Sequence, residues 1–566
     1  MNTRFVLVVI TTCVLAGVLL GFVFWGPSLF AGASNVGPAA AIPTVQPTVT
    51  ANNPIARENA LPGSYNWEIL ASRSATTQIQ AFASATSVAP GQSIKFYVST
   101  SVDGASYNIE IYRLGWYGGA GGRLITSLTH AKGVNQGYYD SNNRRLGCKS
   151  CTQDAATGLL ETHWKDTDTL QIPNNWTTGV YLAKFVDPHG YQTYAPFDVL
   201  GSTSSTYVVV TPDTTAAAYN NWGGASLYDE DDAMKAPKSP GAGVSKVSFD
   251  KPYAQESGAG LNLIFNMQTI RYLERQGYDV SYISDVDLHV NPAQLLTHKA
   301  YLSIGHDEYW TREMRDGVEK ARDQGMGMAF LGANTAYWQM RFEPDSAGVP
   351  NRTVVCYKVQ KGLGITDLAR DPLYGIDNTR VTTQWRDPVV GRPENALTGV
   401  MFSELTHKVT AFPWTVDPHA NSPLLKGTGL DTGKTYGCAL VGYEWDRIFN
   451  QPGDAPEWQA ATPKGLQVIS SSKVIAHEAS DPNAPDGKQE TSNSVYYVAP
   501  SGALVFSTGS IHWAQGLDDY RARSVLSYYK QLTTTCPNGS KAVPGMQKLM
   551  NNVMDALVVK HPSGTL

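Results

Sequence analysis

Short runs of alternating apolar and polar residues dominate the chain from residue 61 onward. Three of them are SIKFYVST (93–100), YNIEIYRLG (107–115) and GVYLAKFVD (179–187). In the second run, Tyr107, Ile109 and Ile111 fall on one face and the residues between them on the other, which is the period of a β-strand. Gly, Pro and Asn separate the runs, so residues 61–203 are predicted to form a β-sandwich-like domain.

After residue 204 the pattern changes to compact apolar strands that alternate with amphipathic segments. Residues 262–277 and 311–325 place apolar side chains at helical spacing and end in glycine, as many helices do. Strands are predicted at 206–212, 278–283, 299–305, 328–334 and within 502–517, and a closing helix at 521–534. This alternation predicts a parallel sheet with helices on both faces over residues 204–534, followed by a C-terminal tail at 535–566.

The first 60 residues carry no such pattern. Residues 5–25 contain no charge and are long enough to cross a bilayer as a helix, whereas Ala31-Gly32-Ala33 offers the cleavage site of a secretory signal. Arg4 precedes the run, which places the short N-terminus in the cytoplasm and the rest outside. Residues 1–33 are therefore predicted as a transmembrane anchor or signal segment, and residues 34–60, rich in Pro, Ala and Thr, as an extended linker. The predicted location is the cell membrane, single-pass with an extracytoplasmic body, or secreted after cleavage.

Composition narrows the class of protein. With 566 residues, about two or three domains are expected. The net charge of −5 without a basic stripe makes nucleic acid an unexpected partner.

The Cys148-Lys-Ser-Cys151 pair is interpreted as a structural disulfide, with a redox pair or half a zinc site as alternatives. Cys13 lies in the apolar run, which leaves an odd number of cysteines outside it: Cys148, Cys151, Cys356, Cys438 and Cys536. At least one of these thiols is therefore expected to stay unpaired.

Polar and aromatic loops follow four of the predicted parallel strands, after residues 210, 304, 331 and 508. Ligands of such sheets bind beyond the carboxyl ends of the strands, so these loops predict a shared site. In GHDEYW, His306 and Glu308 stand two residues apart on a turn. They suit either a hard metal ion or metal-free acid–base work. Alternatively, Asp307 and Glu308 cap the helix that follows.

The predicted turns carry no serine or cysteine elbow, so a hydrolase of this kind would activate water. Glu444 lies between Tyr443 and Trp445, and such surroundings raise the proton affinity of a carboxylate and suit an acid or base. The alternative is a surface pair between Glu444 and Arg447 at helical spacing.

Seven ordered segments together resemble the N,N-dimethylformamidase large (beta) subunit-like family, over roughly residues 65–530. They are AYNNWGGASLY (218–228), SYISDVDLH (281–289), SIGHDEYW (303–310), FLGANTAYW (330–338), RTVVCYK (352–358), PENALTG (393–399) and GSIHWAQG (509–516). The resemblance implies a β-domain followed by a Rossmann-like α/β domain related to class I amidotransferases but without their cysteine. It implies an amidohydrolase with a mononuclear Fe(III) held by two tyrosines and a glutamate.

The resemblance assigns roles to single residues. Glu308 matches the ligand glutamate and His306 a site histidine two residues before it. Asn334 and Glu444 match positions for support or acid–base chemistry. One ligand tyrosine is expected in AYNNWGGASLY, where Tyr219 and Tyr228 compete, and the other earlier in the chain, with Tyr181 as the candidate.

Two features depart from the family's plan: the N-terminal segment, and a small partner subunit that this chain does not contain. The expected substrate is therefore a small amide rather than dimethylformamide itself, and the expected partner is a small subunit or a second copy of the chain. The leading hypothesis is an extracytoplasmic, membrane-anchored, iron-dependent amidohydrolase. The alternative is a non-catalytic cell-envelope module that binds glycan or polymer on the same fold.

Overall fold

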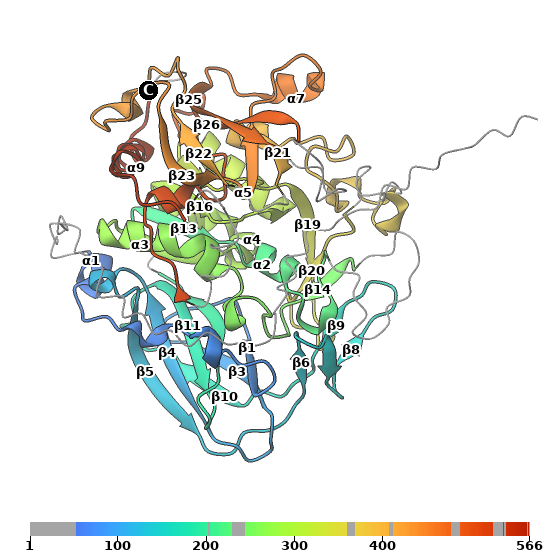
Figure 1. Ribbon diagram of the computed structural model, residues 1–566. Coiled ribbons are helices and arrows are strands. Elements are labelled where there is room, and N and C mark those ends of the chain that lie inside the picture. The colour runs from blue at the N-terminus through green and yellow to red at the C-terminus, as the bar shows by residue number, and fades with distance from the viewer. Residues whose placement is uncertain are drawn as a thin grey trace, which may run out of the picture.

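The computed structural model describes residues 53–201, 204–228, 244–358, 368–406, 411–476, 487–523, 536, 539–562, 564 and 566. Two sheets face each other at one end of the molecule, drawn in blue and teal in Figure 1. The three-stranded sheet has the order β1 (Ile79–Ala83), β3 (Ser93–Thr100), β10 (Asp168–Gln171). The five-stranded sheet has the order β2 (Ser87–Val88), β12 (Gln192–Val199), β11 (Gly179–Val186), β4 (Tyr107–Leu114), β5 (Gly122–His130).

The inward positions of these strands share one apolar core. Phe96 of β3 contacts Phe185 of β11 and Phe197 of β12, with ring centroids 5.5 and 6.0 Å apart. Tyr107, Ile109 and Ile111 are buried in the same cluster, as their alternation predicts. The strands predicted at 93–100, 107–115 and 179–187 are therefore confirmed.

A seven-stranded mixed sheet forms the centre of the second part of the chain. Its order is β15 (Val280–Ser284), β13 (Tyr207–Thr211), β16 (Ala300–Ile304), β18 (Gly327–Leu331), β27 (Leu504–Ser507), β26 (Gln489–Val498), β25 (Gln467–Ile475). The first five strands in this order pair in parallel with their neighbours, whereas β26 pairs antiparallel with both β27 and β25. The helices near this sheet are α2 (Asp213–Tyr219), α3 (Met267–Arg275), α4 (Asp285–Val290), α5 (Arg312–Asp323), α6 (Asn395–Thr398), α7 (Pro456–Ala461) and α9 (Pro544–Leu557).

The predicted fold class is wrong in its α/β part. The described residues are mainly β and form eight sheets with few helices, so a Rossmann-like, amidotransferase-like α/β domain is not what the chain adopts. The apolar runs predicted the parallel strands, but runs between residues 350 and 500 form antiparallel strands of their own. The small sheets are β14–β20–β19–β17 (Lys246–Ser248, Thr353–Val355, Trp338–Glu343, Tyr309–Thr311), β21–β24 (Met401–Leu405, Glu444–Arg447), β22–β23 (Phe412–Thr415, Thr435–Val441), β6–β7 (Tyr138–Asp140, Arg145–Gly147) and β8–β9 (Thr152–Gln153, Leu160–Glu161).

The membrane part of the predicted fold and the predicted localisation also need correction. Among the residues placed by the structure, no helix is both long and apolar enough to cross a bilayer, and the predicted span at 5–25 lies outside them. The structure thus gives no support to a single-pass anchor or to an extracytoplasmic body, and neither is retained below.

The predicted linker contains one helix. Residues 54–59 form α1 (Pro54–Asn59), whose first turn is capped by the Asn53 side chain and whose Ile55 is fully buried. The other linker residues up to 52, and most of the predicted closing helix at 521–534, lie outside the described residues. Within the predicted tail, α9 buries one apolar face on the central core.

The cysteines bear out the disulfide prediction. Cys148 and Cys151 are bonded, as are Cys438 and Cys536, and Cys356 is a buried free thiol.

Candidate active site

The loop after β16 carries the motif GHDEYW into the interior. Gly305 has φ +69°, and a Cβ at this position would lie 2.1 Å from Asn266 Oδ1, so the sharp turn requires glycine. His306 is 1% and Glu308 2% exposed. The turn therefore directs an imidazole and a carboxylate into the protein at the end of a parallel strand.

Helix α2 fixes the backbone of the GHDEYW turn through hydrogen bonds of two threonine side chains. The Glu308 backbone N–H donates to Thr215 Oγ1 at 2.9 Å, and Thr214 Oγ1 donates to the Tyr309 carbonyl at 2.8 Å. Tyr219 is the last residue of the same short helix. One helix therefore fixes both the backbone of Glu308 and the tyrosine that reaches its carboxylate.

Two phenols converge on Glu308. Tyr219 donates to Glu308 Oε2 at 2.9 Å, and the Tyr228 hydroxyl lies 2.9 Å from Oε1 and 3.0 Å from Oε2. The two rings stack with centroids 4.1 Å apart. Tyr309 in turn donates to the Tyr228 oxygen at 2.6 Å. The result is a compact set of oxygen atoms around one buried carboxylate.

A second carboxylate, that of Glu444, approaches the same ring nitrogen of His306 as Glu308 does. His306 Nε2 is 3.3 Å from Glu308 Oε2 and 3.1 Å from Glu444 Oε2. Asn334 Nδ2 donates to the same Glu444 oxygen at 3.0 Å. The Asn334 backbone N–H donates to Asp446 at 2.8 Å, which ties the loop after β18 to β24. The structure therefore brings together Tyr219, Tyr228, His306, Glu308, Asn334 and Glu444 from four separate segments of the chain.

Two buried polar atoms in this site have no hydrogen-bond partner among the described residues. They are Asn334 Oδ1 and His306 Nδ1, whereas His306 Nε2 lies within reach of the Glu444 and Glu308 carboxylates. A buried polar atom without a partner costs free energy, typically about 1–3 kcal/mol. Such atoms gathered in one place mark where another molecule or ion would be bound.

Burial shapes the electrostatics of the site. Loss of hydration raises the pKa of Glu308, and the neighbouring Glu444 raises it further against the opposing effect of His306. Burial alone would lower the pKa of His306, but Glu444 and Glu308 outweigh it, so the pKa is raised. Loss of hydration and the nearby Glu308 also raise the pKa values of the Tyr219 and Tyr228 phenols. All four groups therefore hold a proton more tightly than they would in water.

Lys358 lies beside the site although the sequence analysis gave it no role. Lys358 Nζ lies 3.1 Å from the centroid of the Tyr228 ring, and burial lowers the pKa of this ammonium to about 8. It ends the segment RTVVCYK, which carries the family resemblance, so the signal was present although the lysine received no role.

The remaining sequence candidates lie differently. Tyr181 is not brought to the site: its ring stacks on Trp176 in the sandwich core, and its hydroxyl donates to the Thr177 carbonyl at 2.6 Å. Asp307 does not cap α5, since it accepts from Ser303 and Trp310.

The structure also differs from the two structural alternatives, namely helix capping by Glu308 and a surface ion pair between Glu444 and Arg447. Thr311 caps α5, so Glu308 is not a helix cap. Glu444 lies on the strand β24, and Arg447 pairs with Asp454 instead of with Glu444.

The donor atoms fit a hard metal ion. In the described part of the chain, no group of three or more His, Cys, Asp or Glu residues is arranged for a metal. Here two phenols accompany one carboxylate, and anionic oxygen ligands of this kind suit Fe(III). Glu308, Tyr219 and Tyr228 are the residues that would hold such an ion, and His306 Nε2 lies 3.3 Å from the same Glu308 carboxylate.

Comparison with known proteins decides the family. A family model described as N,N-dimethylformamidase beta subunit-like, C-terminal, matches residues 108–526. The chain belongs to this family. The N,N-dimethylformamidase beta subunit of Paracoccus aminophilus is 25% identical over 305 residues, and that of an Alcaligenes species 24% identical over 304 residues. These matches cover 49% and 50% of this chain but 38% of each relative.

The family recognised from the motifs is thus confirmed, and the chain spans well under half the length of the curated relatives that it matches. Among solved structures, a Paenibacillus cycloisomaltooligosaccharide glucanotransferase with bound cycloisomaltoheptaose matches at 11% identity, over 52% of this chain and 36% of that one. Its TM-score of 0.14 supports no conclusion about fold or function.

Proposed function

We propose that this protein hydrolyses the C–N bond of a small amide at a site where Glu308, Tyr219 and Tyr228 hold one Fe(III) ion. The observation that carries the proposal is the convergence of two phenols on one buried carboxylate, next to a His306–Glu444 pair whose surroundings include unpartnered polar atoms. Membership of an amidohydrolase family supports the reaction class.

The metal and the protein side chains would have different roles in the reaction. When bound, Fe(III) would polarise the amide carbonyl and acidify water. Glu444 takes the proton of the attacking water and returns it to the leaving amine as the C–N bond breaks, which yields a carboxylic acid and an amine. His306, 3.1 Å from Glu444 Oε2, holds this carboxylate and shares its proton.

Asn334 has a supporting role in this scheme. Its Nδ2 donates to Glu444, which fixes the amide orientation and leaves Oδ1 as an acceptor without a partner. That oxygen is placed to accept a hydrogen bond from substrate or leaving amine. The names of the relatives support a further subunit as a partner of this chain.

Two variants test the proposal on the purified full-length chain. Wild type should contain about one iron per chain and show the visible absorption expected of iron–tyrosinate ligation. Glu308→Ala should lose the iron, because it removes the central carboxylate. Glu444→Gln should keep the iron and lose turnover of small amides by about 100-fold or more, the usual loss for a general acid–base group.

The outcomes separate the roles. Iron at wild-type occupancy in Glu308→Ala would overturn the ligand assignment. Unchanged turnover in Glu444→Gln would overturn the role of Glu444 as acid and base. Tyr181→Phe is the matched control, because its hydroxyl lies in the sandwich core and its loss should leave both iron and turnover unchanged.

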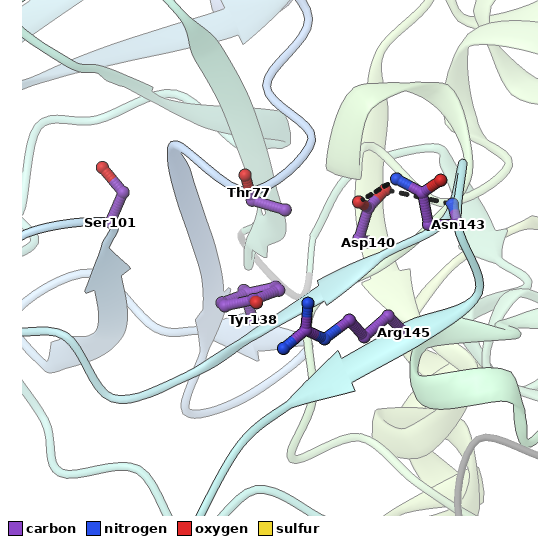
Figure 2. Close-up of a pocket in the computed structure, with 6 residues that line it drawn as sticks. All are labelled: Thr77, Ser101, Tyr138, Asp140, Asn143 and Arg145. Carbon is purple, nitrogen blue, oxygen red and sulfur yellow. Dashed lines mark hydrogen bonds between the residues drawn. The ribbon is translucent and has the colours of Figure 1, made fainter.

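A second candidate function, binding of a glycan or polymer, is favoured by a separate cleft of about 270 Å³. Figure 2 shows Tyr138 and Arg145 near each other there, with Asp140 and Asn143 close by. An aromatic ring beside polar side chains suits a sugar. Titration with soluble oligosaccharides should give saturable binding that Tyr138→Ala abolishes, while no binding would remove this candidate.

A further inference from the structure

The two phenols at Glu308 differ in their surroundings. Tyr219 donates to Glu308 Oε2, whereas the Tyr228 oxygen lies near both carboxylate oxygens and 2.6 Å from the hydroxyl of Tyr309. Tyr309 belongs to the short strand β17 and is fully buried.

Counting protons sets the direction of these bonds. Each phenol has one hydroxyl proton, and a carboxylate can only accept. Tyr228 therefore gives its proton to Glu308, and the short contact between the two hydroxyls uses the proton of Tyr309. The order is Tyr309 to Tyr228 to Glu308, and Tyr219 donates separately to Glu308 Oε2.

We propose that Tyr309 is a positioning residue that orients the Tyr228 oxygen and tunes it as a metal ligand. The inference rests on the proposed function, since it concerns the same iron site. It adds a residue that the sequence analysis gave no role, although Tyr309 lies within GHDEYW.

The backbone around Tyr309 makes it a rigid donor. Its carbonyl accepts from Thr214 of α2 at 2.8 Å, and its strand pairs in parallel with β19 opposite Trp338. When Tyr228 binds a metal as a phenolate, its own proton is gone but the bond from Tyr309 persists. A hydrogen bond to a metal-binding group from a residue behind it commonly changes metal affinity by about 10–100-fold.

Tyr309→Phe removes the hydroxyl and keeps the ring, so the variant is expected to fold. Its Fe(III) dissociation constant, measured by competition with a chelator, should rise about 10-fold or more. The charge-transfer band of the iron-loaded protein should move to longer wavelength, because a phenolate that has lost a hydrogen bond gives up electron density more readily. Neither readout depends on turnover.

Tyr337→Phe is the matched control. Its ring belongs to the same aromatic cluster, and its hydroxyl accepts a hydrogen bond from Gln384, so affinity and band should match wild type. Wild-type values in Tyr309→Phe would overturn the inference and leave the proposed function intact. A wild-type protein that takes up no Fe(III) would overturn both, which distinguishes the two failures.

Discussion

Asn334 combines a functional side chain with an unusual backbone. Its φ of +56° lies in the left-handed region, which asparagine tolerates better than most residues, and its amide donates to Glu444. Asn334→Ala should lose the amide and also strain the backbone, by about 1 kcal/mol relative to glycine. Chemical denaturation should therefore find Asn334→Ala less stable than Asn334→Gly.

The same pair separates structure from chemistry. Both variants lack the carboxamide side chain of Asn334. Their turnover of the amide substrate should therefore fall to a similar level, although their stabilities differ. Equal stability of the two variants would contradict the backbone argument, and turnover retained in Asn334→Gly would contradict the role of the amide.

At the scale of single residues, the sequence indicated which side chains could take part in a site better than it indicated where each side chain lies in the fold. The turn motif points to His306 and Glu308, the aromatic neighbours point to Glu444, and the family resemblance points to Asn334. All four meet in space. Tyr181 was chosen without such a constraint and belongs to the sandwich core, where a tyrosine needs only a partner for its hydroxyl. The sequence offered Tyr219 and Tyr228 as competing candidates, but it could not show that both reach Glu308, because contacts between phenols depend on the fold.

At the scale of elements, helix α5 illustrates an ion pair that makes stability depend on pH. Glu319 accepts from Arg315 at 2.5 Å and from Arg392 at 2.7 Å. Burial alone would raise its pKa, but the two guanidinium groups outweigh this and lower the pKa from 4.5 to about 2. A carboxyl with a lowered folded-state pKa stabilises the protein above its unfolded pKa and loses this effect as the pH falls.

The free energy of unfolding of wild type should thus exceed that of Glu319→Gln by about 2 kcal/mol at pH 7, discounted for partial exposure. The difference should shrink between about pH 4.5 and pH 2. Denaturant unfolding at several pH values measures it. Asp323→Asn, on the same helix with an exposed side chain, should behave like wild type, and a difference independent of pH would contradict the assignment.

Periodicity predicted many of these elements, including α5 and the strands β13, β16 and β18. It could not predict how strands between residues 350 and 500 choose partners. Pairs such as β21 with β24 join segments separated by a long stretch of sequence, and an alternating run fits a parallel or an antiparallel neighbour equally well. This is the physical reason that the α/β class was wrong.

At the scale of the whole molecule, a buried ion pair joins the sandwich to the rest. Arg113 of β4 and Glu274 of α3 are both fully buried, with two contacts of 2.8 Å. Asn59 of α1 donates to the same carboxylate at 2.7 Å. No local pattern predicts this pair, because its partners are 161 residues apart and each alone would be an unfavourable buried charge.

We expect Arg113→Met to lower the free energy of unfolding by about 3–5 kcal/mol, because Glu274 would be left buried without its cation. Glu274→Leu should be similarly destabilising, since it strands Arg113. The double variant should be more stable than the sum of the single effects predicts, with a coupling energy of about 2 kcal/mol or more from chemical denaturation. Single effects that simply add would mean that Arg113 contributes through its bonds to the Thr178 carbonyl and not through Glu274. In that case the two parts of the molecule would be held together by apolar contact, and the ion pair would fix only how they are oriented.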